Sequence, residues 1–248
     1  ISLDHRADSP PRGGKLIHHR FDGDIDHVAG RVIIHTLYDH GEWPSRDPAH
    51  DGRHFDPPES ITPHIWRRDV LYVHDLELLV ISDRLSCEAE ALPSDWNLLV
   101  HADAVTVDGA TARFSGSFGV DLDVFLLEPE DPCLHVGSWA HQGFDEPRLP
   151  HWWWRSARWT APPGTRMTAM AERALTLRAH AGPARGYVAV LAARRSGEDA
   201  AEATRPDGGL HVRTARGTCR VRTDPGGIVN VAIERPEGLS HRVVLAAP

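Results

Sequence analysis

The stretch R-R-D-V-L-Y-V-H-D-L-E-L-L-V-I-S-D-R-L, residues 67–85, contains two short apolar runs separated by the polar pair His74-Asp75. Residues 70–73 form the first run and residues 78–81 form the second. Both runs are too short for a typical helix and are rich in residues that suit a pleated surface. The stretch therefore predicts a hairpin of two buried strands. Asp83-Arg84 indicates a charged end to the second strand, where we expect a structural ion pair.

Outside this hairpin the chain continues as short apolar segments separated by turn residues. Asp22-Gly23-Asp24 and Asp108-Gly109 are typical of tight turns between paired strands. Further short segments with turn signals between them are residues 15–21, 25–38, 95–101, 120–127, 210–215, 218–223, 228–234 and 241–245. Regular short strands without intervening helices predict an all-β fold, an antiparallel β-sandwich.

Residues 142–150, which are charged and contain proline, form the best candidate for an internal boundary. We therefore predict a main β-sandwich over residues 1–145, with the hairpin 67–85 at its centre. Residues 146–248 either continue the sandwich or form a small C-terminal β subdomain. A length of 248 residues allows one or two β domains.

Charge and composition exclude some classes of partner. The chain has 27 Lys plus Arg against 35 Asp plus Glu, a net charge of −8, which argues against nucleic acid or an anionic membrane surface. No stretch approaches the roughly 18 apolar residues of a membrane span. Cys87, Cys133 and Cys219 fit neither a disulfide framework nor a metal knuckle. Ile1 in place of Met suggests a processed chain or a piece of a longer protein.

Several short motifs resemble the C-terminal β-sandwich region of heparinase II/III-like polysaccharide lyases. The matching segments, in chain order, are Phe21-Asp22-Gly23 through Gly30, the hairpin ending Val80-Ile81-Ser82-Asp83-Arg84-Leu85, residues 96–101 and Trp154-Arg155-Ser156-Ala157-Arg158-Trp159. The resemblance covers most of the chain, although each motif is short and structural.

The resemblance implies a sandwich that works with an (α/α) toroid, which supplies a Tyr and other groups to a shared cleft. It implies β-elimination on an acidic polysaccharide that contains uronic acid, a divalent metal such as zinc or calcium, and a secreted or periplasmic location. No segment of this chain predicts the toroid. The alternative function is a non-catalytic carbohydrate-binding or structural module built on the same sandwich.

Histidines before the hairpin are the candidates for chemistry in this chain, which has 17 His. His18 and His19 are candidate catalytic bases, and His18, Asp22 and His27 are candidate metal ligands. Neighbouring residues of a strand face opposite sides, so His18 and His19 would need a bulge to face one ion. Compositional bias is the alternative explanation for the many histidines.

Two other stretches are candidate contacts for an anionic sugar. In the long loop 39–58, an aromatic ring and cationic groups are suited to stacking and to binding a carboxylate. The second stretch is a run of tryptophans that could form a sugar platform. These candidate substrate-binding residues are Trp43, Arg46, Arg53, His54, Trp152 and Trp153. A solvated loop and a buried aromatic core remain the respective alternatives.

Overall fold

The computed structural model describes residues 2–3, 12–37, 59–138, 174–181, 186–238 and 240–245. Within them the chain forms strands and one short 3-10 turn, Pro206–Gly208, and it contains no α-helix. Every strand pair is antiparallel, and the strands form two sheets, so the predicted all-β sandwich is confirmed. Within the same residues, no helix has the length and apolar character needed to cross a membrane.

The larger sheet has 11 strands and the smaller has five. In spatial order the larger sheet contains β2 (Arg12–Phe21), β3 (Ile25–Leu37), β4 (Glu59–Val73), β5 (Leu78–Cys87), β11 (Gly186–Arg195), β8 (Val120–Glu128), β7 (Thr111–Gly116), β6 (Ser94–Asp108), β10 (Ala174–Ala181) and β9 (Cys133–Ser138), with β1 (Ser2–Leu3) paired to β6. The smaller sheet contains β12 (Glu202–Thr204), β13 (Leu210–Thr214), β14 (Gly217–Thr223), β15 (Val229–Glu234) and β16 (Ser240–Leu245).

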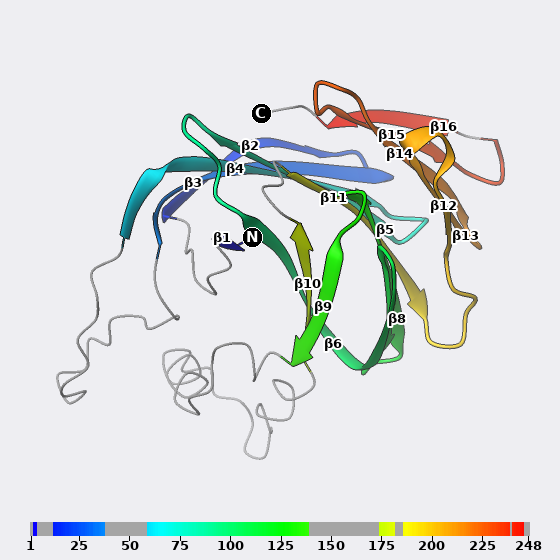
Figure 1. Cartoon of the computed structure of the whole chain (residues 1–248). Helices are drawn as coiled ribbons and strands as arrows, with labels where there is room; N and C mark the ends of the chain where they lie inside the picture. The colour runs from blue at the N-terminus through cyan, green and yellow to red at the C-terminus, as the bar shows by residue number, and fades with distance from the viewer. Residues whose placement is uncertain are drawn as a thin grey trace, which may run out of the picture.

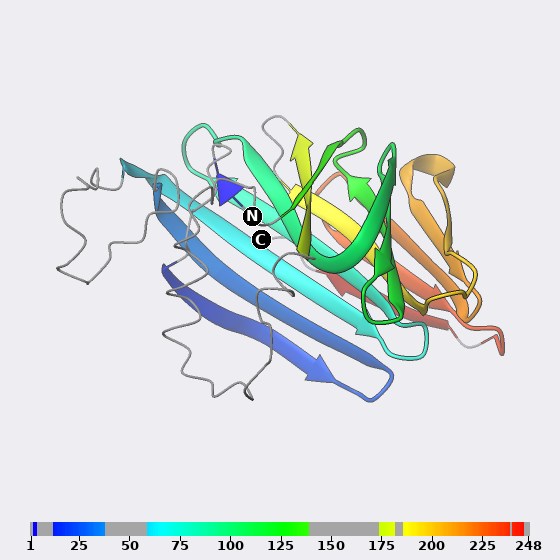
Figure 2. The same ribbon diagram turned by 90° about the horizontal axis from the view of Figure 1, so that it is seen from below.

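The larger sheet curls, so that β6, β10 and β9 return beneath β4 and β5 (Figures 1 and 2). Its inner face encloses one apolar core, in which Trp96 of β6 and Phe114 of β7 lie together with Tyr187 of β11. Its outer face packs on the smaller sheet around a second core that includes Val80, Val190 and residues of β13 to β16. The middle strands are therefore buried on both faces, which explains their continuous apolar runs.

The central hairpin forms as predicted, with β4 and β5 joined by a turn over residues 74–77. The predicted charged end at Asp83-Arg84 is wrong, because β5 continues to Cys87 and both side chains are buried. Asp83 has no exposed surface and accepts hydrogen bonds from Trp66 Nε1 and from Arg68 Nε and Nη2, each at 2.7 Å. The partners of this carboxylate lie on β4, whereas Arg84 Nη1 contacts only the main-chain carbonyl of Asp83, at 3.5 Å.

Arg84 faces the smaller sheet and links β5 to two distant segments, the end of β8 and the turn before β15. Its Nη1 contacts Glu128 Oε2 at 2.7 Å, and its Nε donates to the carbonyl of Gly227 at 3.0 Å. Gly186 of β11 passes so close that a Cβ atom there would lie 2.6 Å from the carbonyl oxygen of Asp83. Close packing across β5 therefore requires glycine at this position.

A second ion pair joins the hairpin turn to the smaller sheet. The guanidinium of Arg235, at the end of β15, forms two hydrogen bonds to the carboxylate of Asp75. These bonds hold the pKa of Asp75 below its ordinary value. The hairpin therefore contacts both cores and both sheets.

Strands from both sides of the predicted boundary at residue 145 share the larger sheet. β10 pairs with β6, and β11 lies between β5 and β8. The smaller sheet is formed by residues 202–245 alone. The division into residues 1–145 and 146–248 stays a prediction.

Asp83→Ala should lower the free energy of unfolding by about 3 kcal/mol, because it removes three hydrogen bonds and leaves Trp66 Nε1 without its acceptor. Urea unfolding followed by tryptophan fluorescence measures the change. Glu202→Ala is the control, since that carboxylate is 67% exposed in its pair with Arg213 and should change stability by less than about 0.5 kcal/mol. Equal effects of the two variants would contradict the assigned role of Asp83.

Candidate active site

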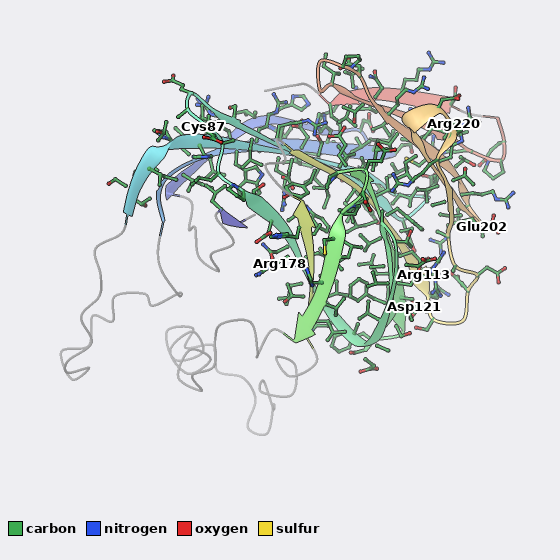
Figure 3. The ribbon with its side chains drawn as sticks, in the orientation of Figure 1. Cys87, Arg113, Asp121, Arg178, Glu202 and Arg220 are labelled. Atoms are coloured by element: carbon green, nitrogen blue, oxygen red, sulfur yellow. The ribbon has the colours of Figure 1, made fainter. Side chains whose placement is uncertain are left out.

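Polar side chains form two rungs across the neighbouring strands β6, β10 and β9. Directly paired residues of antiparallel strands share one face of the sheet, and each β10 residue here has a partner on both sides. The first rung contains Asp95, His180 and Cys133, and the second contains Asn97, Arg178 and His135. Figure 3 shows Arg178 on the side of β10 that faces away from the smaller sheet.

Asp95 orients the imidazole of His180. His180 Nδ1 lies 2.5 Å from Asp95 Oδ1, and the Asp95 side chain has no exposed surface whereas that of His180 is 36% exposed. A buried carboxylate on Nδ1 fixes the ring orientation and the tautomer. Proton exchange with a ligand on this face would then use Nε2.

Arg178 places a cation next to this histidine. Its Nε donates to Asn97 Oδ1 at 2.9 Å and lies 4.0 Å from Asp95 Oδ2. Its two η nitrogens form no hydrogen bond to another described residue. Residues two apart on a strand have their side chains roughly 7 Å apart. His180 and Arg178 can therefore contact different groups of one small ligand.

The outer strand β9 adds a thiol and a second imidazole. Cys133 Sγ lies 3.2 Å from His135 Nε2, and both residues are exposed. The rings of His135 and His180 meet edge to face, with centroids 6.3 Å apart. The site therefore presents two imidazoles to one surface.

Tyr187 supports the site from inside the inner core. Its hydroxyl donates to the carbonyl of Ser94 and lies 3.1 Å from Ser94 Oγ. Burial, together with the negative charges of Asp95 and Asp83, raises the pKa of Tyr187 to about 12. The hydroxyl therefore stays protonated at neutral pH and fixes β11 to β6 directly behind Asp95.

An oriented histidine beside a cation and an amide can remove a proton next to a carboxylate. The histidine acts as the general base, and the guanidinium offsets the negative charge that develops on the carboxylate. An all-β fold and a net charge of −8 do not by themselves place these side chains together. Their arrangement follows from the pairing of β10 with both β6 and β9.

The structure places His18 and His19 on opposite faces of β2, away from this site. His18 stacks near His27, with centroids 4.7 Å apart, whereas His19 lies 5.8 Å from the ring of Phe21. His18, Asp22 and His27 line one pocket between β2, β3, β4 and β16. The catalytic role of His18 and His19 stays a prediction.

Two of the candidate metal ligands, Asp22 and His27, form ion pairs with other side chains of the protein. Asp22 accepts a hydrogen bond from the backbone N–H of Ile25, which is the main reason that its pKa lies below the ordinary value, and it also pairs with the guanidinium of Arg20. Among the described residues, no group of three or more His, Cys, Asp or Glu is placed to hold a metal ion. Zinc or calcium binding by His18, Asp22 and His27 stays a prediction.

The remaining predicted substrate contacts lie outside the described residues. They are Trp43, Arg46, Arg53, His54, Trp152 and Trp153. Sequence reasoning missed His180, Asp95 and Arg178. The alternation Thr176-Leu-Arg-Ala-His180 was the available signal, because it places Arg178 and His180 on one polar face of a strand.

No family model and no curated protein matches this chain. Solved structures similar to it include the heparan sulfate lyase HepC of Pedobacter heparinus and a mutant of that enzyme, each with a TM-score of 0.45 and 12% identity. Each match covers 94% of this chain and 28% of that one. Heparinase III has a TM-score of 0.40 and 13% identity, with 94% and 27% covered. The chain thus spans under a third of the length of these lyases.

Cys133 should react with a thiol reagent such as DTNB in the folded protein, and Cys219 should react only after unfolding. Cys133 is exposed, whereas Cys219 has no exposed surface and burial raises the pKa of its thiol to about 12. Release of the coloured thiolate at pH 8 follows the reaction. The test uses a Cys87→Ser background, because Cys87 is partly exposed and could also react. In that background Cys133→Ser should remove the fast phase, and a fast phase that persists would show that the surface of β9 is assigned wrongly.

Proposed function

We propose that this chain is the β-sandwich part of a polysaccharide lyase that cleaves a uronic-acid-containing polysaccharide by β-elimination. The observation that carries the proposal is the His180–Asp95 pair with Arg178 on the same face of β10. The motifs that resemble heparinase II/III-like lyases agree with it, and Asp83 and Arg84 of one such motif prove to be central to the fold.

In the proposed reaction His180 Nε2 takes the proton from the carbon beside the uronate carboxylate. The electron pair of that C–H bond forms a carbon–carbon double bond, and the bond from the neighbouring carbon to the glycosidic oxygen breaks. Arg178 binds the carboxylate and offsets its charge as the proton leaves. The departing oxygen takes up a proton, and the product is an unsaturated uronate.

We assign the donor that protonates the leaving oxygen to the proposed toroid and not to a residue of this chain. The resemblance implies an (α/α) toroid that supplies a Tyr to the shared cleft, and a phenol there could donate this proton. Tyr187 does not fit this role, because it is buried and its hydroxyl bonds to Ser94.

His180→Ala should lower the rate of product formation by the full-length protein at least 100-fold, because a positioned general base contributes about 10²- to 10⁴-fold. Asp95→Asn should lower it by a smaller factor, since the base is kept but loses its orientation. The measurement is the rise in ultraviolet absorbance of unsaturated uronate over a panel of uronic-acid polymers. Thermal unfolding checks that each variant is folded.

His211→Ala is the matched control, because His211 lies on β13 of the smaller sheet and should leave the rate unchanged. Product formation that survives in His180→Ala would sink the assignment of the base. A full-length protein that binds these polymers and yields no unsaturated product would instead be a non-catalytic carbohydrate-binding module.

A further inference from the structure

A second polar pocket lies between the edge of the larger sheet and the edge strand of the smaller one. It has a volume of about 490 Å³ and is lined by β2, β3, β4 and β16, none of which contributes to the His180 site. Its polar side chains are, from the larger sheet, His18, Arg20, Asp22, His27 and Arg67, and, from the smaller sheet, His241 and Arg242.

Part of this polar lining is held in place by its own contacts. Arg67 donates from Nε and Nη2 to Asp69, which is 2% exposed, and His27 Nε2 lies 3.0 Å from the same carboxylate. Arg20 pairs with Asp22 at 2.7 Å. These contacts pre-position one wall of the pocket and balance the charges of two of its guanidinium groups.

The other polar groups are unmatched within the described chain. The side chains of His18, His241 and Arg242 form no hydrogen bond or ion pair with another described residue. The pocket is therefore left with one guanidinium charge beyond its acid–base pairs, in a protein whose net charge is −8. Imidazole N–H groups approach the same space from both sheets. Such converging donors are suited to an oxyanion.

The apolar lining indicates a ligand larger than a bare anion. Ile25, Leu71, Val243 and Val244 line the same space, and Val244 is 58% exposed. Pockets of roughly 300 Å³ or more with a few convergent polar groups are typical of small-molecule sites. A pyranose ring can pack its C–H face on the aliphatic side chains while its anionic group meets the cations.

We propose that this pocket binds one acidic residue of a saccharide, through its carboxylate or sulfate, as a non-catalytic site separate from His180. The saccharide nature of the ligand rests on the proposed function, whereas the oxyanion preference rests on the pocket itself. The pocket would hold part of a long polymer at a distance from the point of cleavage.

Calorimetric titration of the full-length protein tests this proposal in an Arg178→Ala, His180→Ala background, which removes the proposed base and carboxylate contact of the catalytic site. The three probes are a polygalacturonate hexasaccharide, neutral chitohexaose and sodium sulfate. We expect the acidic hexasaccharide to bind and chitohexaose not to bind. Arg242→Ala should weaken binding of the acidic hexasaccharide at least 10-fold, and His241→Ala at least 3-fold. Arg220→Ala, an equal charge change on β14 at an exposed side chain outside the pocket, should weaken it less than 2-fold.

Equal weakening by Arg220→Ala and Arg242→Ala would show non-specific charge attraction and would contradict binding in the pocket. Sodium sulfate binding as tightly as the hexasaccharide would overturn the saccharide part and leave a bare oxyanion site. The pocket and the lyase activity are tested independently. If the protein forms no unsaturated product but Arg242→Ala weakens binding, the binding site is supported and the lyase assignment is rejected. If the protein forms product but its binding does not depend on Arg242, the binding site is rejected and the lyase assignment is supported.

Discussion

The carboxylate of Asp83 has no exposed surface, and a buried charge must be fully hydrogen-bonded. Trp66 and Arg68 supply the three donors from β4, and the guanidinium of Arg68 lies over the Trp66 ring, 4.9 Å from its centroid. This requirement fixes the register of β4 on β5, because a slip of one residue would turn Arg68 to the other face of the sheet. The other strands of the larger sheet add to this pair on both sides, β3 next to β4 and β11 next to β5.

The candidate active site depends on the same set of buried charges. Tyr187 lies next to Asp83 in the β5–β11 pairing and reaches Ser94 on β6, beside the second buried carboxylate, Asp95. Both carboxylates act on the Tyr187 hydroxyl, which stays neutral. The orientation of His180 is therefore connected through Asp95 and Tyr187 to the centre of the hairpin. Packing within the inner core decides where the proposed base lies.

Local signals in the sequence predicted the sandwich and its central hairpin, because apolar runs and turn residues act over a few positions. The same reasoning misplaced Asp83 and Arg84 at a strand end. The partner of Asp83, Arg68, lies opposite it in the hairpin and is found only once the register is known, whereas the partner of Arg84, Glu128, is 44 residues away. The rungs at Asp95 and His180 could not be predicted, because they depend on the register between strands of separate segments. The pocket that His18 and His27 share with His241 could not be predicted either, because it forms where two sheets pack together.

The position of β11 between β5 and β8 affects how the chain can fold during synthesis. Val80 pairs with Val190, so β5 emerges from the ribosome long before its neighbour does. Until β11 arrives, the hairpin exposes apolar side chains on both faces and an unpaired strand edge, which are the features that promote aggregation. Pairing over such long separations is slow to form. The strand that completes the sheet is thus also the one whose late synthesis prolongs exposure of an aggregation-prone edge.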